Sequence, residues 1–278
     1  MKTIRSIFGV VMMVLLTGLF GGCEPKEEPL AYWYPKKQLV EEFVSTKCGY
    51  CAMGMEAVHD FVAEDTTFVV IAHHYGYQTD KFSVKEGDVI CNQLGVNGTP
   101  SASINRAKTN YYRKQSAVVF NPAYLSETKK EQFDDRTYAC VDITNTYYPG
   151  AREVKIHISG RVSPSENPSL KLNVLIKESG MISSQSDYYN NNGWKEYRHT
   201  DAVRAFLTGA KGDEVTITNH RFSADYTCVL DDDWIPENCM VVAFICEDFQ
   251  PVVNADQKPV VKGTNGGAEF APEGITLR

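Results

Sequence analysis

Apolar residues follow a helix period in one part of this chain and a strand period in another. An apolar run over residues 39–44 is typical of a buried strand, and the polar residues 45–47 predict a turn after it. From Cys51 onward, apolar residues recur at steps of three and four, which predicts a helix with one apolar face. Cys48 and Cys51 form a Cys-Gly-Tyr-Cys segment between strand and helix. Cys48 is therefore expected near the positive end of the helix dipole, where a thiolate is favoured.

The next residues continue an alternation of strand, loop and helix. Residues 67–74 predict a second buried strand, residues 77–87 a loop, and residues 89–96 a helix capped by Asp88. A Gly-Thr-Pro sequence, residues 98–100, then leads into another strand. Thr99-Pro100 is a candidate cis peptide bond, because only bonds that precede proline adopt the cis form at low cost. Residues 122–135 predict a further helix.

The pattern changes near residue 137 to a strict alternation of apolar and polar residues. Strands of this kind are expected at residues 154–158 and 170–176, with further strands up to residue 246, and turns rich in Pro and Gly separate them. Many short alternating strands indicate an antiparallel β-sandwich. Residues 179–200 are polar and rich in Asn, and predict a long loop. We place one domain at residues 38–136 and a second at residues 137–278.

The N-terminus carries a targeting signal. Residues 1–22 begin with basic residues and continue with an apolar stretch that is too short for a stable membrane span. Residues 19–23 resemble a bacterial lipobox that ends at Cys23, although Phe20 stands where the pattern prefers Leu. Lipidation of Cys23 would anchor the protein to a membrane, and cleavage without lipidation is the alternative. Residues 23–37 then form a tether, and its acidic part resembles a surface-export signal or serves as a plain periplasmic linker.

Composition narrows the functional classes. The net charge of −7 and the absence of a basic patch argue against nucleic acid as a partner. A secreted chain resides in an oxidising compartment, where disulfides persist. Five cysteines remain once Cys23, Cys48 and Cys51 are assigned: Cys91, Cys140, Cys228, Cys239 and Cys246. They form at most two structural bridges, or they are buried free thiols.

The motifs together resemble two known groups. Residues 40–51 and 95–106 are similar to the dithiol and proline segments of the thioredoxin superfamily. The lipobox, these two segments, and residues 72–76, 199–209 and 242–244 together resemble the 28-kDa outer-membrane protein family of envelope lipoproteins. The resemblance implies an α/β plus all-β chain, with a thioredoxin-like domain followed by an Ig-like β-sandwich. It also implies an outer-membrane location, surface-exposed or facing the periplasm.

The first functional hypothesis is thiol–disulfide exchange on envelope or surface proteins. Cys48 would attack a substrate disulfide, and Cys51 would resolve the mixed disulfide. The resemblance implies that Glu42, six residues before Cys48, is a buried acid that exchanges protons with Cys51. Since Glu41 and Glu42 point to opposite strand faces, one of them is expected to face solvent. Substrate would be bound by residues of the dithiol and proline segments: Gly49, Tyr50, Thr99 and Pro100.

The second hypothesis is a binding lipoprotein in which the Cys48–Cys51 disulfide is structural. Tyr188, Tyr189 and Trp194 in the expected loop would then contact a surface ligand. A metal site from Cys48, Cys51 and the histidines at 73 and 74 lacks a second paired-ligand segment, so no metal and no cofactor are expected. His59 is expected on the surface of the first helix.

Overall fold

The computed structural model describes residues 28–63, 65–75, 79–113, 115–190 and 193–264. Residues 1–22 and Cys23, for which a signal and a lipid anchor are expected, lie outside these ranges. The described residues are rich in strands and poor in helices, which agrees with an α/β part followed by a β-rich part. None of the described helices is long and apolar enough to cross a membrane.

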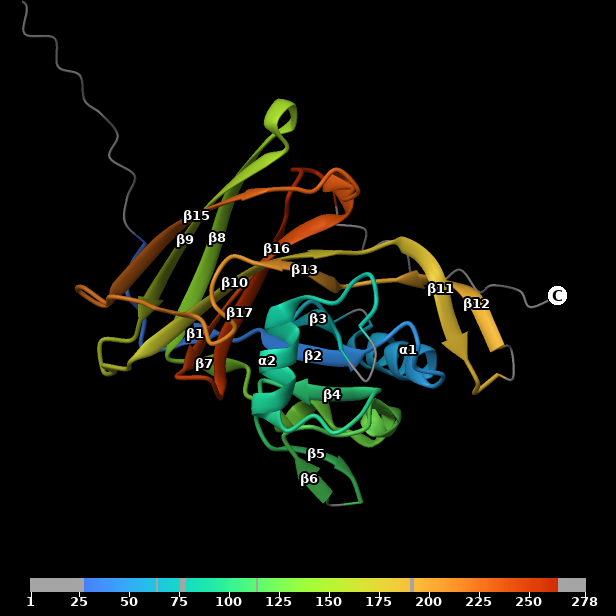
Figure 1. The fold of residues 1–278 in the computed structure, drawn as a ribbon. Helices are drawn as coiled ribbons and strands as arrows, with labels where there is room; N and C mark the ends of the chain where they lie inside the picture. The colour runs from blue at the N-terminus through green and yellow to red at the C-terminus, as the bar shows by residue number, and fades with distance from the viewer. Residues whose placement is uncertain (1–27, 64, 76–78, 114, 191–192, 265–278) are drawn as a thin grey trace, which may run out of the picture.

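The first half of the chain alternates strands and helices (Figure 1). Its elements are β1 (Tyr34–Pro35), β2 (Gln38–Val44), α1 (Cys51–Val62), β3 (Phe68–His74), α2 (Lys85–Leu94), β4 (Ser101–Ile104), β5 (Thr109–Tyr112), β6 (Gln115–Ala117), the 3-10 helices η1 (Pro122–Glu127) and η2 (Lys130–Gln132), and β7 (Arg136–Thr137). The second half is formed by strands. They are β8 (Ala139–Tyr148), β9 (Glu153–Val162), β10 (Leu170–Glu178), β11 (Met181–Asp187), β12 (Gly193–His199), β13 (Ala202–Phe206), β14 (Asp213–Glu214), β15 (Arg221–Val229), β16 (Cys239–Glu247) and β17 (Val252–Pro259), with 3-10 turns η3 (Pro149–Ala151) and η4 (Pro236–Asn238).

One mixed sheet joins the two halves. Its strand order is β17-β16-β10-β13-β3-β2-β4, and β14 pairs with the first residues of β10. The junction is a parallel pairing of β13 with β3 through Ala202 and Ala72, where the Ala72 N–H donates to the Asp201 carbonyl at 2.7 Å. The expected boundary at residues 136–137 falls in β7, which pairs with β1 outside this sheet. The dithiol segment and the C-terminal strands therefore share one continuous hydrogen-bonded framework.

Strands β2 and β3 are buried along their whole length. Val40 and Val44 lie on the face that packs against α1, and Leu39 lies in a cluster with residues of β13, β16 and β17 on the other face. A sheet covered on both faces leaves no solvated side for alternate residues. The expectation that either Glu41 or Glu42 faces solvent was therefore wrong, because both side chains are buried.

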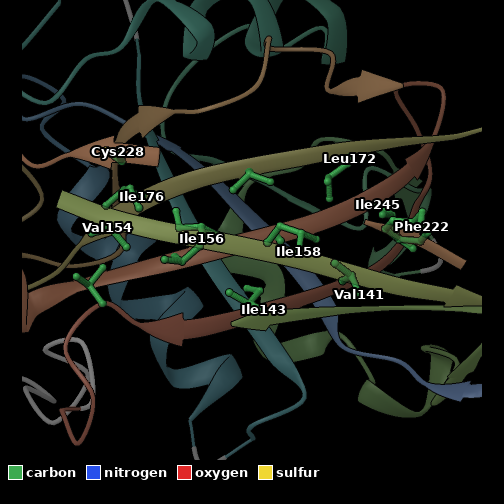
Figure 2. Packing of buried hydrophobic residues seen from close by; sticks show 14 of the residues in the cluster. Val141, Ile143, Val154, Ile156, Ile158, Leu172, Ile176, Phe222, Cys228 and Ile245 are labelled. Carbon is green, nitrogen blue, oxygen red and sulfur yellow. The ribbon is translucent and has the colours of Figure 1, made fainter. Parts of the chain in front are cut away.

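The second layer of the C-terminal half is the three-stranded sheet β15-β9-β8. Its alternating apolar residues, such as Val154, Ile156 and Ile158 of β9, point toward β10 and β16 and form one cluster with Leu172 and Ile176 (Figure 2). Strands β9 and β15 thus bury about every second residue, as the period of two in the sequence predicts, whereas β10 and β16 are buried along nearly their whole length. Two β-sheets packed face to face form the core of this half.

Three segments differ from the sequence expectations. Residues 122–135 contain only the 3-10 helices η1 and η2, since the chain becomes extended at Thr128 and Lys129 between them. Helix α2 begins at Lys85, so Asp88 lies in its first turn rather than at its cap. Residues 179–200 form the β11–β12 hairpin instead of a loop, and this hairpin contacts α1 (Figure 1). Both strands of this hairpin consist mostly of polar residues, so the sequence predicted a loop.

Candidate functional site

A disulfide joins Cys48 and Cys51 at the start of α1, with their Cα atoms 5.4 Å apart. Cys51 is the first residue of the helix and is fully buried, whereas Cys48 lies in the preceding turn and is partly exposed. The turn is fixed by backbone hydrogen bonds from the Cys48 N–H to the Ser45 carbonyl and from the Cys51 N–H to the Cys48 carbonyl. Cys48 is therefore the more exposed member of the pair, and Cys51 is shielded.

Glu42 lies in β2 between Val40 and Val44, on the sheet face that carries α1. Its side chain is buried, and its Oε1 atom has no hydrogen-bond partner among the described residues. Burial raises the pKa of this carboxyl to about 8, although the charges of His59 and Lys177 lower it. The acid is thus mostly neutral near pH 7 and lies on the sheet face that packs against the helix beginning at Cys51.

The peptide bond between Thr99 and Pro100 is cis, and both residues are half-buried. Pro100 packs against α1 at Gly54, three residues after Cys51, where an added Cβ would lie only 2.5 Å from the Pro100 Cβ. The proline segment thus lies beside the first turn of the helix. Of the two residues between the cysteines, Tyr50 is exposed and Gly49 is buried.

The β11–β12 hairpin covers part of the dithiol segment, a contact that the sequence analysis did not anticipate. The backbone N–H groups of Tyr188 and Tyr189 donate to the Gly49 carbonyl at 2.9 and 3.3 Å. The Gln185 amide donates to the Cys48 carbonyl at 2.8 Å, and a Cβ on Gly49 would overlap the Tyr188 side chain. The hairpin therefore fixes the backbone of the segment but leaves Cys48 partly exposed. In the sequence, the aromatic residues within residues 179–200 were the feature that could have indicated a contact between this segment and another part of the chain.

The two histidines at the end of β3 have structural partners. His73 bonds Glu41 at 3.0 Å, and Glu41 also receives two hydrogen bonds from the fully buried Arg106. Burial would raise the pKa of Glu41, but Arg106 and His73 outweigh burial and hold it well below its usual range. His74 bonds Asp80 at 2.8 Å. Across the described residues, no group of His, Cys, Asp and Glu is arranged to hold a metal ion.

A second charged group, also missed by the sequence analysis, lies near Glu42. It joins His59 of α1 with Lys177 of β10 and with Asp201, which directly precedes β13. His59 is partly buried against this group rather than being a surface residue of α1. These residues come from distant parts of the chain, so no local spacing could show that they meet.

The other cysteines form no bridges among the described residues. Cys91, Cys140, Cys228, Cys239 and Cys246 are all buried free thiols. Burial raises the pKa of each thiol, to about 11 for Cys228 and to about 12 for Cys246. Of the two possibilities left open by the sequence, the structure has buried thiols.

Comparison with known proteins gives a family and a structural neighbour. The solved structure of HBP35 of Porphyromonas gingivalis superimposes with a TM-score of 0.67 and 21% sequence identity, covering 88% of this chain and 80% of that chain. Identity at this level shows a shared fold. No curated protein matches the sequence. The model of the family described as outer membrane protein Omp28 matches residues 88–264, which excludes the dithiol segment but includes more than half of the chain. The chain therefore belongs to the Omp28 outer membrane protein family, as its sequence motifs predicted.

Proposed function

We propose that this protein exchanges thiols and disulfides with other proteins in the bacterial envelope. The observation that carries the proposal is the asymmetric disulfide at the start of α1, with Cys48 partly exposed and Cys51 buried. A buried neutral Glu42 beneath α1 and a cis Thr99–Pro100 bond beside it supply what such a dithiol needs for proton transfer and substrate contact.

The reaction starts from the disulfide form. A thiolate of a substrate dithiol attacks the sulfur of Cys48, the bond between Cys48 and Cys51 breaks, and Cys51 leaves as a thiolate that takes a proton from Glu42. The second substrate thiolate then attacks the mixed disulfide, and Cys48 leaves. Two electrons pass from the substrate dithiol to the Cys48–Cys51 pair. The reverse sequence reduces a substrate disulfide.

Location and architecture form part of the same proposal. The family description supports an outer-membrane or envelope location. We propose that Cys23 carries the lipid anchor, that residues 23–37 are the tether, that residues 38–136 form a thioredoxin-like unit, and that the strands after residue 137 form an Ig-like sandwich. The partners are the membrane, through the lipid, and protein thiols or disulfides.

The test is reduction of the disulfides of insulin by the purified protein in the presence of dithiothreitol. We expect catalysis by the wild-type chain and loss of at least 90% of the rate, roughly tenfold or more, in Cys48→Ser. Cys140→Ser removes a buried thiol of the second layer and serves as the matched control. An equal rate in Cys48→Ser and Cys140→Ser contradicts the proposal.

The β11–β12 hairpin supports a second candidate function, in which the protein binds a surface ligand and the Cys48–Cys51 disulfide is structural. Its hydrogen bonds to the Gly49 carbonyl stabilise the dithiol segment in the disulfide form, and the side chains of Tyr188, Tyr189 and Trp194 are exposed. Exposed aromatic residues are common at binding surfaces. A disulfide that resists dithiothreitol in the native protein, together with no activity on insulin, would favour this function.

A further inference from the structure

The segment that leads into β2 is fixed to strands of the C-terminal half. The Glu28 carboxylate accepts a hydrogen bond at 2.9 Å from Arg161 of β9, and Arg221 of β15 donates to the Glu28 backbone carbonyl. These two arginines are register partners in the outer sheet, so both hold Glu28 at one place. Tyr34 of β1 is buried, and its ring centroid lies 5.5 Å from the Arg161 guanidinium. The proposed tether is therefore docked from Glu28 onward.

This docking limits how far the folded protein can lie from its proposed lipid anchor. Glu28 is five residues after Cys23, and a segment of that length spans at most about 18 Å when fully extended. A lipid on Cys23 would hold that residue at the bilayer surface. The ten-residue strand β9 alone spans roughly 33 Å, so the tether reaches only about half the length of this strand. A face of the protein close to Glu28 must therefore lie nearest to the bilayer.

Two exposed aromatic residues lie in this segment. The Tyr32 side chain is 78% exposed and that of Trp33 is 50% exposed. The guanidinium of Arg136, itself an exposed residue of β7, lies 4.2 Å from the centroid of the Trp33 ring. Tyrosine and tryptophan are enriched at the level of the lipid headgroups, where one side of the ring is apolar and the other is hydrated. An aromatic pair beside a guanidinium has the chemistry that this level favours.

Arg136 also lines a cavity of about 400 Å³ with two further basic residues. These are Lys36, which directly precedes β2 by two residues, and the exposed Lys108. Asp134 and Glu247 are the acidic residues of the lining, so three cations face two anions. Anionic headgroups attract lysine and arginine near a membrane surface. We call Tyr32, Trp33, Lys36, Lys108 and Arg136 together the Trp33 surface.

The Trp33 surface and the dithiol lie at opposite ends of β2. The segment with Trp33 precedes Gln38, the first residue of the strand, and Cys48 follows Val44, its last residue. The seven residues of β2 span roughly 23 Å. The β11–β12 hairpin lies at the dithiol end, because it donates to the Gly49 carbonyl. Figure 1 shows the same separation, with β1 and β7 on one side of the molecule and α1 with the hairpin on the other.

We propose that the Trp33 surface rests on the lipid headgroups of a bilayer and that this contact points the Cys48–Cys51 pair and the hairpin away from the membrane. The inference rests on the proposed lipid at Cys23 and does not require exchange activity. The short link brings the surface to the headgroups, the aromatic rings enter the interface, and the basic residues contact phosphate groups. The dithiol is then presented to proteins in the surrounding compartment.

The first experiment measures contact between Trp33 and lipid. The full chain, lipidated at Cys23, is placed in vesicles of phosphatidylethanolamine and phosphatidylglycerol whose acyl chains carry bromine near the headgroups, because bromine quenches tryptophan fluorescence on contact. The chain has three tryptophans, and Trp194 on the hairpin is 58% exposed, which makes it the matched control for Trp33. We expect quenching in the wild type and in Trp194→Phe, and loss of nearly all quenching in Trp33→Phe.

The opposite results overturn the proposal. Quenching that persists in Trp33→Phe, or that disappears in Trp194→Phe, would show that another face meets the bilayer. An unquenched Trp33 in the lipidated wild type, whether it stays in solvent or is covered by a second copy of the chain, would do the same.

A charge reversal tests the basic part of the surface without changing its aromatic residues. Arg136→Glu should lower the quenching of Trp33 by about half in these anionic vesicles. Lys85→Glu makes a charge reversal at a position of α2 that is 90% exposed, and should leave quenching unchanged. Equal quenching in the two variants would overturn the assignment of Arg136 to the headgroup contact.

A third measurement follows the orientation of the dithiol. In the reduced, vesicle-bound protein, a maleimide that does not cross membranes should label Cys48 as fast as it does in detergent, and slower labelling in vesicles would overturn the orientation. Mass spectrometry of the mature chain separates the possible failures. A lipid on Cys23 with an unquenched Trp33 would overturn the Trp33 surface and leave the anchor, whereas a chain without lipid would overturn both.

Discussion

Replacement of Glu42 by Gln tests the central electrostatic feature of the site, a carboxyl that is buried and neutral. In the folded protein its pKa is raised from 4.5 to about 8, mainly by burial. An acid with a raised pKa contributes its full stability below pH 4.5 and has lost it once the pH has risen through about 8, because in this range the unfolded chain ionises a carboxyl that the fold keeps protonated. Glutamine has a similar shape and never ionises, so the variant lacks this loss.

The magnitude follows from the two pKa values. Each tenfold change in proton affinity is worth about 1.4 kcal/mol, so the full cost of ionising Glu42 in the fold is about 5 kcal/mol. Between pH 5.5 and pH 8.5, linkage predicts a loss of about 3 kcal/mol from this group alone. His59, whose pKa is raised to about 9, loses stability in the same direction as the pH rises from about 6.5. The difference between the wild type and Glu42→Gln in this loss of stability isolates the contribution of Glu42.

The assay is urea unfolding of the oxidised full chain at the two pH values. The wild type should lose about 3 kcal/mol more than Glu42→Gln on going from pH 5.5 to pH 8.5. Glu56→Gln makes the same chemical change at an exposed position of α1 and should behave as the wild type. Equal losses in wild type and Glu42→Gln would show that Glu42 is ionised or solvated in the fold, and the proton-transfer argument would fail with it.

Three further predictions concern the surroundings of the site. Gly49→Ala should destabilise the protein by about 1–3 kcal/mol and speed amide hydrogen exchange in the β11–β12 hairpin, whereas Gly209→Ala, where a Cβ meets open space, should change neither. Arg106→Met should cost about 3–5 kcal/mol in urea unfolding at pH 7, because it leaves Glu41 buried without its guanidinium partner. That cost should shrink as the pH falls through the acid range, where Glu41 takes up a proton in the variant before it does in the wild type; a cost that is independent of pH would contradict the ion-pair explanation. In the reduced native protein, maleimide should label Cys48 first among the described cysteines, and mass spectrometry would identify the labelled residue. The reason is that the five thiols outside the pair are buried and have raised pKa values. Rapid labelling of any of those five would contradict their burial.

Local patterns in the sequence were sufficient for the strand, dithiol and helix of residues 38–62. The apolar run, the steps of three and four, and the position of Cys51 at the helix start depend on residues close in the chain, and the structure has β2 and α1 there. The cis bond at Pro100 and the alternating strands of the second half follow from short-range properties as well. The same patterns did not predict the hairpin of residues 179–200, because its strands are mostly polar and contain few apolar residues.

The sequence by itself determined β2, α1 and the alternating strands of the second half, since strand and helix periods and the chemistry of Cys and Pro act over a few residues. Only the tertiary structure decided that Glu41 as well as Glu42 is buried, because that depends on which elements cover both faces of β2. Only the tertiary structure brought Lys177 and Asp201 to the level of Glu42, through the pairing of β13 with β3. That pairing joins segments about 130 residues apart, and its partner strand is chosen by the packing of the whole sheet rather than by any local pattern.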